Sequence, residues 1–114
     1  MLRQSTDPGS AYYAAFVTPG NGIVVQYRTA QGTGAQQSAG FAGTVPAYLM
    51  VARSGNTYTA YTSTNGTTWT VVSGSSVTLN TSGSVLAGLA VTSHDASALS
   101  TVTFETVSVS TAVP

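Results

Sequence analysis

The chain has 114 residues and almost no charge: three basic and three acidic side chains balance to a net charge of zero, and charged residues make up 5% of the sequence. So few cations cannot form the phosphate-neutralising stripe that nucleic-acid binding requires, and they give an anionic membrane little to attract. Cysteine is absent, which excludes disulfides and thiolate metal sites, and the length suits a single domain.

The first third of the chain predicts a β-hairpin. The sequence DPGS at 7–10 is typical of a turn, and the segments 11–18 and 23–29 alternate with period two on either side of PGNG. Both faces of 11–18 are apolar enough to be covered. In 23–29 the alternation predicts three inward and three outward side chains: Ile23, Val25 and Tyr27 inward, and Val24, Gln26 and Arg28 outward.

The middle of the chain predicts a three-strand antiparallel meander over 47–53, 57–63 and 68–73, preceded by a weak edge strand over 35–42. Asn65-Gly66 supplies residues that accept the positive φ of a tight hairpin turn. The strict alternation of the central strand divides its side chains between two faces: Tyr58, Ala60 and Thr62 on one, and Thr59 and Tyr61 on the other.

The turn after the central strand carries a short motif. The residues Ser63 to Trp69, STNGTTW, are similar to the Asp-box turn of sialidases and related β-proteins, Ser-x-Asp-x-Gly-x-Thr-Trp. Asn65 replaces the aspartate, and one spacer residue is missing. The motif is structural in that family, so the similarity implies a turn and no sialidase activity.

The last third predicts three more strands. A short one covers 75–79, and the nearly continuous apolar run over 85–92 is expected to be the most buried strand. The final strand, 100–110, changes phase, and a β-bulge near 105–106 would return its four large apolar residues to the core: Val102, Phe104, Val107 and Val109. With 111–114 as a tail or linker, residues 1–110 predict one all-β domain, an antiparallel two-sheet β-sandwich.

Three stretches in this order, LRQSTDPGSAYYAAFVTPGNGIVVQYR, LMVARSGNTYTAYTSTNGTTW and GLAVTSHDASALSTVTFETVSV, resemble the concanavalin A-like lectin/glucanase domains. These are jelly-roll accessory modules of bacterial secreted proteins. The resemblance implies a secreted or cell-surface protein whose export signal is not in this chain. It also implies that the first strands of the usual module are missing before Met1, so the sandwich is incomplete at its N-terminus. Unpaired strand edges then predict a homo-oligomer.

Five side chains are candidates for carbohydrate binding. A sugar site requires a few aromatic rings for stacking and planar polar groups for the hydroxyls, and the candidates of these kinds are Gln26, Arg28, Tyr48, Tyr61 and Trp69. Structural roles compete with this interpretation, because a lone tryptophan after a turn often packs across its own hairpin, and tyrosines often fill a less apolar core face. Arg53 is expected to bind a carboxylate or loop carbonyls.

Catalytic and metal sites are not expected. The chain has three carboxylates, Asp7, Asp95 and Glu105, with no Glu-x-Asp-x-Glu pattern of the jelly-roll glucanases and no Gly-x-Ser-x-Gly nucleophile elbow. Asp95, beside His94, is a weak Ca²⁺ candidate because calcium needs several oxygen ligands, and a solvated loop is the alternative. We therefore expect no enzyme and no cofactor. Two functions remain: a carbohydrate-binding or surface-recognition module that binds a polysaccharide or other glycan, and a self-assembling β module without a ligand.

Overall fold

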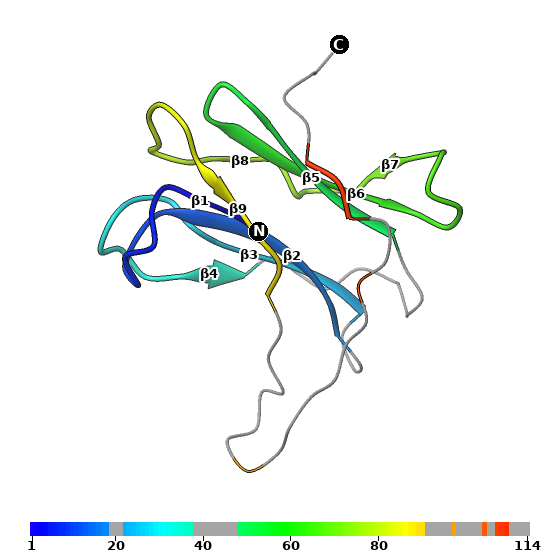
Figure 1. Ribbon diagram of the computed structural model, residues 1–114, viewed down its shortest axis with the longest axis horizontal. Coiled ribbons are helices and arrows are strands. Elements are labelled where there is room, and N and C mark those ends of the chain that lie inside the picture. The colour runs from blue at the N-terminus through cyan, green and yellow to red at the C-terminus, as the bar shows by residue number, and fades with distance from the viewer. Residues whose placement is uncertain (19–21, 38–47, 91–96, 98–103, 105–106, 110–114) are drawn as a thin grey trace.

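The computed structural model describes residues 1–18, 22–37, 48–90, 97, 104 and 107–109. These residues form strands and turns, and none of them belongs to a helix that is long and apolar enough to cross a membrane. The strands make two antiparallel sheets that enclose a shared apolar core, which confirms the predicted all-β, two-sheet architecture (Figure 1).

The first sheet has five strands in the order β4-β3-β2-β1-β9. Its members come from the two ends of the described chain: β1 (Leu2–Arg3), β2 (Tyr12–Thr18), β3 (Gly22–Arg28), β4 (Gln36–Gln37) and β9 (Leu86–Ala87). The β2–β3 hairpin runs in register from Tyr12 opposite Arg28 to Thr18 opposite Gly22, as the alternation predicts. The predicted edge strand over 35–42 is confirmed at β4; Ala35 is outside the strand, and residues 38–42 lie outside the described residues.

The second sheet has four strands, and its order β5-β6-β7 is the predicted meander. Its members are β5 (Tyr48–Ser54), β6 (Thr57–Ser63), β7 (Thr70–Val71) and β8 (Val77–Thr78). The long pair β5–β6 turns at Gly55, whose φ of 61° suits a glycine in a tight turn. Both β7 and β8 pair with β6, at its C-terminal and N-terminal halves respectively.

A serine hydroxyl fills the break between β7 and β8. The backbone leaves the ladder after Val72, whose N–H donates to the Ala60 carbonyl at 2.9 Å. Ser75 then points its side chain back at β6, where Oγ accepts from the Ala60 N–H at 3.2 Å and donates to the Ala60 carbonyl at 3.3 Å. The side chain therefore replaces a missing strand partner, and Ser75 is itself buried.

The core between the sheets is centred on tyrosines. The ring of Tyr13 in β2 stacks against Tyr58 of β6, with centroids 5.8 Å apart, and against Tyr27 of β3 at 6.5 Å. Tyr13 donates its hydroxyl to the Ser75 carbonyl at 2.6 Å, and the Tyr58 hydroxyl lies 3.0 Å from Thr81 Oγ1. These buried rings are wide apolar surfaces whose polar ends are hydrogen-bonded, which is how tyrosine is accommodated in a core.

Burial differs from what the sequence suggests at two places, and one prediction is wrong. Val24 lies on the outer side of the first sheet, as predicted, yet it is 2% exposed, so both faces of the hairpin are covered at this position. The run 85–92 is not the most buried strand: its described strand, β9, is the edge of the first sheet, and Leu86 and Leu89 are 50% and 59% exposed. An apolar run does not reveal whether the strand has one neighbour or two.

The final strand also differs from the prediction where it is described. Phe104, Val107 and Val109 are exposed and form no strand, so the core is not completed by these side chains. Val102, the proposed bulge at 105–106 and the tail at 111–114 lie outside the described residues.

Candidate functional site

The outer face of the second sheet brings three of the predicted sugar-binding residues together. Tyr58 and Ala60 of β6 point into the core, so alternation puts Tyr61 on the opposite side of the sheet. Tyr61 lies opposite Met50 of β5 and Val71 of β7. Tyr48 lies two residues before Met50 on β5, on the same side of the sheet, and is paired with Ser63. Trp69 directly precedes β7, in phase with Val71. We call this surface the aromatic face: Tyr48, Met50, Tyr61, Trp69 and Val71.

The aromatic face is open to solvent. Tyr48, Trp69 and Val71 are 43%, 36% and 52% exposed, and Met50 and Tyr61 are half-buried. Diagonal neighbours on adjacent strands stand about 7–8 Å apart, which leaves the rings of Tyr48 and Tyr61 within reach of one ligand.

The Ser63–Trp69 turn holds one end of this face in a fixed shape. Asn65 Oδ1 accepts from the N–H groups of Thr67 and Thr68, both at 2.9 Å, while the Ser63 hydroxyl accepts from Asn65 and Gly66 at 3.2 and 2.9 Å. The asparagine oxygen thus stabilises the turn by accepting from two main-chain amides. The predicted turn at Asn65-Gly66 is confirmed as part of a longer loop.

Tyr48 packs directly on this turn. Gly66 adopts φ of +79°, and a Cβ at this residue would lie 3.0 Å from Cε1 of the Tyr48 ring. The glycine is required both by its left-handed backbone and by the close approach of the ring. The turn therefore determines where the exposed ring of Tyr48 lies.

Among the described residues of β5, β6 and β7, no charged side chain lies on the aromatic face. The charged residue of β5, Arg53, is paired with Tyr58 and so belongs to the opposite side of the sheet. Its guanidinium donates to the carbonyls of Gly55 and Gly83, both at 2.7 Å, which confirms the predicted loop-carbonyl role. The polar groups beside the aromatic face include the hydroxyls of Thr59 and Ser76, which share a 2.9 Å hydrogen bond.

Gln26 and Arg28, the other two predicted sugar-binding residues, are on the first sheet. Alternation with Val25 places both on its outer side, away from the core and from the aromatic face. Gln26 donates to Gln37 Oε1 of the neighbouring β4 at 2.8 Å. Arg28 donates to three loop carbonyls, those of Thr33, Pro8 and Ser10, at 2.8, 3.0 and 3.2 Å. The structure thus separates the five predicted residues into two groups.

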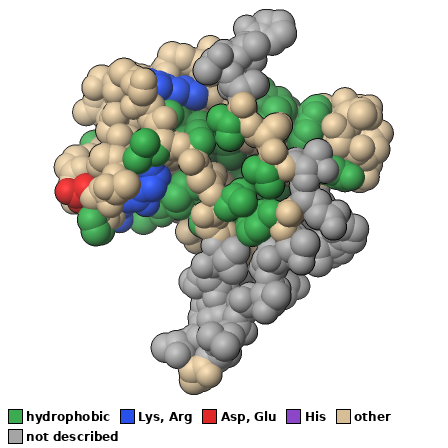
Figure 2. Space-filling view, in the orientation of Figure 1, with side chains coloured by type: hydrophobic (Ala, Val, Ile, Leu, Met, Phe, Trp, Pro, Cys, Tyr) green, Lys and Arg blue, Asp and Glu red, His purple; other side chains and the backbone are tan. Residues whose placement is uncertain are grey.

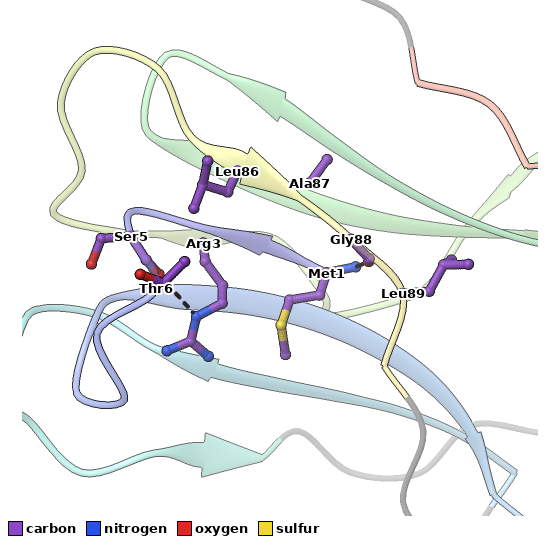
Figure 3. Close-up of a pocket in the computed structure, with 8 residues that line it drawn as sticks. All are labelled: Met1, Arg3, Ser5, Thr6, Leu86, Ala87, Gly88 and Leu89. Carbon is purple, nitrogen blue, oxygen red and sulfur yellow. Dashed lines mark hydrogen bonds between the residues drawn. The ribbon is translucent and has the colours of Figure 1, made fainter.

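A depression that sequence analysis missed lies where β1 meets β9. It has a volume of about 280 Å³ and is lined mainly by apolar groups, with a polar end at Arg3, Ser5 and Thr6 (Figure 3). The two strands are joined there by reciprocal backbone hydrogen bonds between Met1 and Gly88, of 3.1 and 3.0 Å. Figure 2, in the orientation of Figure 1, shows hydrophobic side chains across the middle of the molecule. The exposed Leu86 and Leu89 also line the depression.

The described residues contain no group of three or more histidine, cysteine, aspartate or glutamate side chains that could hold a metal ion. Asp95, His94 and Glu105 lie outside the described residues. Asp7 is exposed in the turn at 7–10, where the Gly9 N–H donates to Oδ1 at 2.8 Å. This backbone hydrogen bond lowers the pKa of Asp7 below the usual value, and a hydrogen bond from the Gln31 side chain and the charge of Arg3 lower it further.

No protein-family model, curated protein or solved structure matches the chain.

Proposed function

We propose that the chain is a non-catalytic carbohydrate-binding module of a secreted or cell-surface protein, and that it binds a polysaccharide on the aromatic face. The observation that carries the proposal is the grouping of Tyr48, Tyr61 and Trp69 on one exposed side of the β5–β6–β7 sheet. Sugar rings present apolar C–H faces that stack on exposed aromatic rings, and their hydroxyls need polar groups at the margin.

The preorganisation of this face supports the proposal. Tyr48 is held by Gly66 and the hydrogen-bonded turn, and Tyr61 sits between two neighbouring strands. Rings that are already ordered lose little conformational entropy when a ligand binds. Because the strands contribute no charge to this face, the class of ligand that suits it is a neutral glycan.

A concanavalin A-like jelly roll is the specific fold that we propose for the two sheets, on the basis of the sequence resemblance. The two antiparallel sheets around one core are compatible with this fold. The non-catalytic part of the proposal rests on the sequence, whose three carboxylates show no glucanase pattern, and on Asp7, whose carboxylate holds a turn.

Retention on polysaccharides tests the proposal. In affinity electrophoresis against a panel of neutral polysaccharides, we expect at least one to retard the native chain. Tyr61→Ala and Trp69→Ala should each weaken this retardation about tenfold, equivalent to about 1.4 kcal/mol. Leu86→Ala is the control, because it truncates an exposed apolar side chain on the other sheet. No retardation of the native chain, or equal losses in all three variants, would contradict the proposal.

A second function, self-assembly through strand edges, is favoured by β9. This strand is the last of the first sheet, and the apolar Leu86 and Leu89 beside its edge are exposed. Edges of this kind pair with other chains unless charge or cover prevents it. Light scattering after size-exclusion chromatography would show oligomers that dissociate in Leu89→Lys, and a monodisperse monomer at micromolar concentration would exclude this function.

A further inference from the structure

Two of the three arginines stand in one row on the outer side of the first sheet. Arg3 of β1 is paired with Tyr12 of β2, which is paired in turn with Arg28 of β3. Both guanidinium carbons lie 5.3 Å from the centroid of the Tyr12 ring. The tyrosine thus holds two cations, one from each flanking strand, at cation–π distance.

Both guanidiniums also converge on one carbonyl of the turn at 7–10. Arg3 Nη2 lies 2.7 Å from the Asp7 carbonyl and 3.5 Å from that of Pro8, while Arg28 Nη1 lies 3.0 Å from the same Pro8 oxygen. Since both nitrogens are bound to one atom, they are no more than about 6.5 Å apart. Like charges this close repel each other, and uncharged carbonyls do not neutralise them.

The nearest described carboxylate, that of Asp7, lies close enough to Arg3 for their charges to interact, but its hydrogen bonds go to other groups. Asp7 Oδ1 accepts from the Gly9 N–H at 2.8 Å and from Gln31 Nε2 at 3.3 Å, and neither arginine donates a hydrogen bond to it. Within the described part of the chain, Arg3 Nη1 and Arg28 Nη2 donate no hydrogen bond. Each cation therefore keeps a terminal N–H₂ group for a further acceptor.

We infer that Arg3 and Arg28 together form a binding site for an oxyanion, a carboxylate or sulfate group, on the outer side of the first sheet. Guanidinium groups bind such oxygens with strong, charge-assisted hydrogen bonds, and an anion shared by both would remove their repulsion. Ser5 and Thr6 lie beside Arg3 at the polar end of the neighbouring depression (Figure 3). The group can belong to a free ion or to an acidic sugar residue, and the site does not depend on the aromatic face.

Arg53 provides an internal control for this inference. It resembles Arg3 and Arg28 in donating to loop carbonyls and in stacking on a tyrosine, at 5.8 Å from the Tyr58 centroid. It differs in having no second guanidinium beside it among the described residues. An effect of anions on arginines in general would therefore reach Arg53 as well, whereas a specific site would not.

Nuclear magnetic resonance of the three arginine Nε–H groups tests the site directly in the native protein. The chain is titrated with sodium sulfate at constant ionic strength, with chloride as the balancing anion. We expect the Arg3 and Arg28 signals to shift along one saturating curve while the Arg53 signal stays in place. Equal shifts of all three signals, or shifts that do not saturate, would overturn the inference.

Two further arms identify the source of the oxyanion. A galacturonate oligosaccharide that gives the same saturating shifts, where its neutral galactose counterpart gives none, supports an acidic sugar. Shifts with sulfate alone support a free ion as the ligand. The variant Arg28→Lys, which keeps the charge and loses the planar fork, should weaken binding at least tenfold, and unchanged affinity would overturn the role of the guanidinium pair. If this variant does not fold, the native titration still decides.

Discussion

Replacement of Ser75 by alanine should destabilise the fold far more than its position in a connecting segment suggests. The Ala60 N–H points toward the break between β7 and β8, and its described acceptor is Ser75 Oγ at 3.2 Å. The Ala60 carbonyl loses the 3.3 Å bond from Ser75 Oγ in the variant but keeps its 2.9 Å bond from Val72, so the N–H alone is left without a partner. A buried donor without a partner costs about 1–3 kcal/mol, which we take as the expected decrease in the free energy of unfolding.

Urea denaturation followed by circular dichroism measures this decrease, with Ser76→Ala as the control. Ser76 is the next residue and also uses its hydroxyl in a hydrogen bond, but this bond, to Thr59, is exposed. Its removal should change the free energy of unfolding by about 0.5 kcal/mol or less. If Ser75→Ala and Ser76→Ala differ by less than this amount, the Ser75 side chain does not replace a strand partner, and our account of the β7–β8 break is wrong.

The remaining predictions concern the turn beside the aromatic face and the core. Gly66→Ala should lose about 1–2 kcal/mol of stability from its positive φ and should displace Tyr48, so urea midpoints and polysaccharide retention should fall together. Asn65→Ala should lose about 0.5–2 kcal/mol because two N–H groups lose their acceptor, whereas Asn65→Asp, measured alongside, should retain stability. Burial raises the pKa of Tyr13 to about 12 in the folded protein. As pH rises above 10, this side chain therefore loses its proton in the unfolded chain before it does so in the folded protein. Stability should therefore be complete below pH 10 and fall by up to about 2.7 kcal/mol toward pH 12, and urea titrations should show this extra fall in the native chain but not in Tyr13→Phe.

The two long hairpins were predictable because local signals agree there. In β2–β3 and β5–β6, period-two alternation over seven residues is bounded by glycine-containing turns, and the observed strands match the prediction within one or two residues. Features that depend on tertiary contacts were not predictable. The exposure of β9 depends on its place at the sheet edge, and the role of Ser75 depends on a gap in a ladder that no local pattern reports.

The candidate site shows the same limit. Alternation correctly puts Tyr61 on the side of β6 opposite Tyr58, because a strand's faces follow from the sequence alone. Alternation cannot say that Arg28 belongs to a different sheet from Tyr61, so the five predicted residues were expected as one set and are found as two. Arg3 was missed because its partner across β2 becomes visible only when the register is known.

The way in which the arginines anchor the loops has a consequence for the pH range over which the loops stay in place. Arg3, Arg28 and Arg53 each hold a loop through carbonyl oxygens of the main chain. A guanidinium stays protonated throughout the range in which proteins function, and a carbonyl does not titrate. These anchors should therefore keep their strength from mildly acidic to mildly alkaline surroundings, where loops tied by carboxylate or histidine partners would loosen.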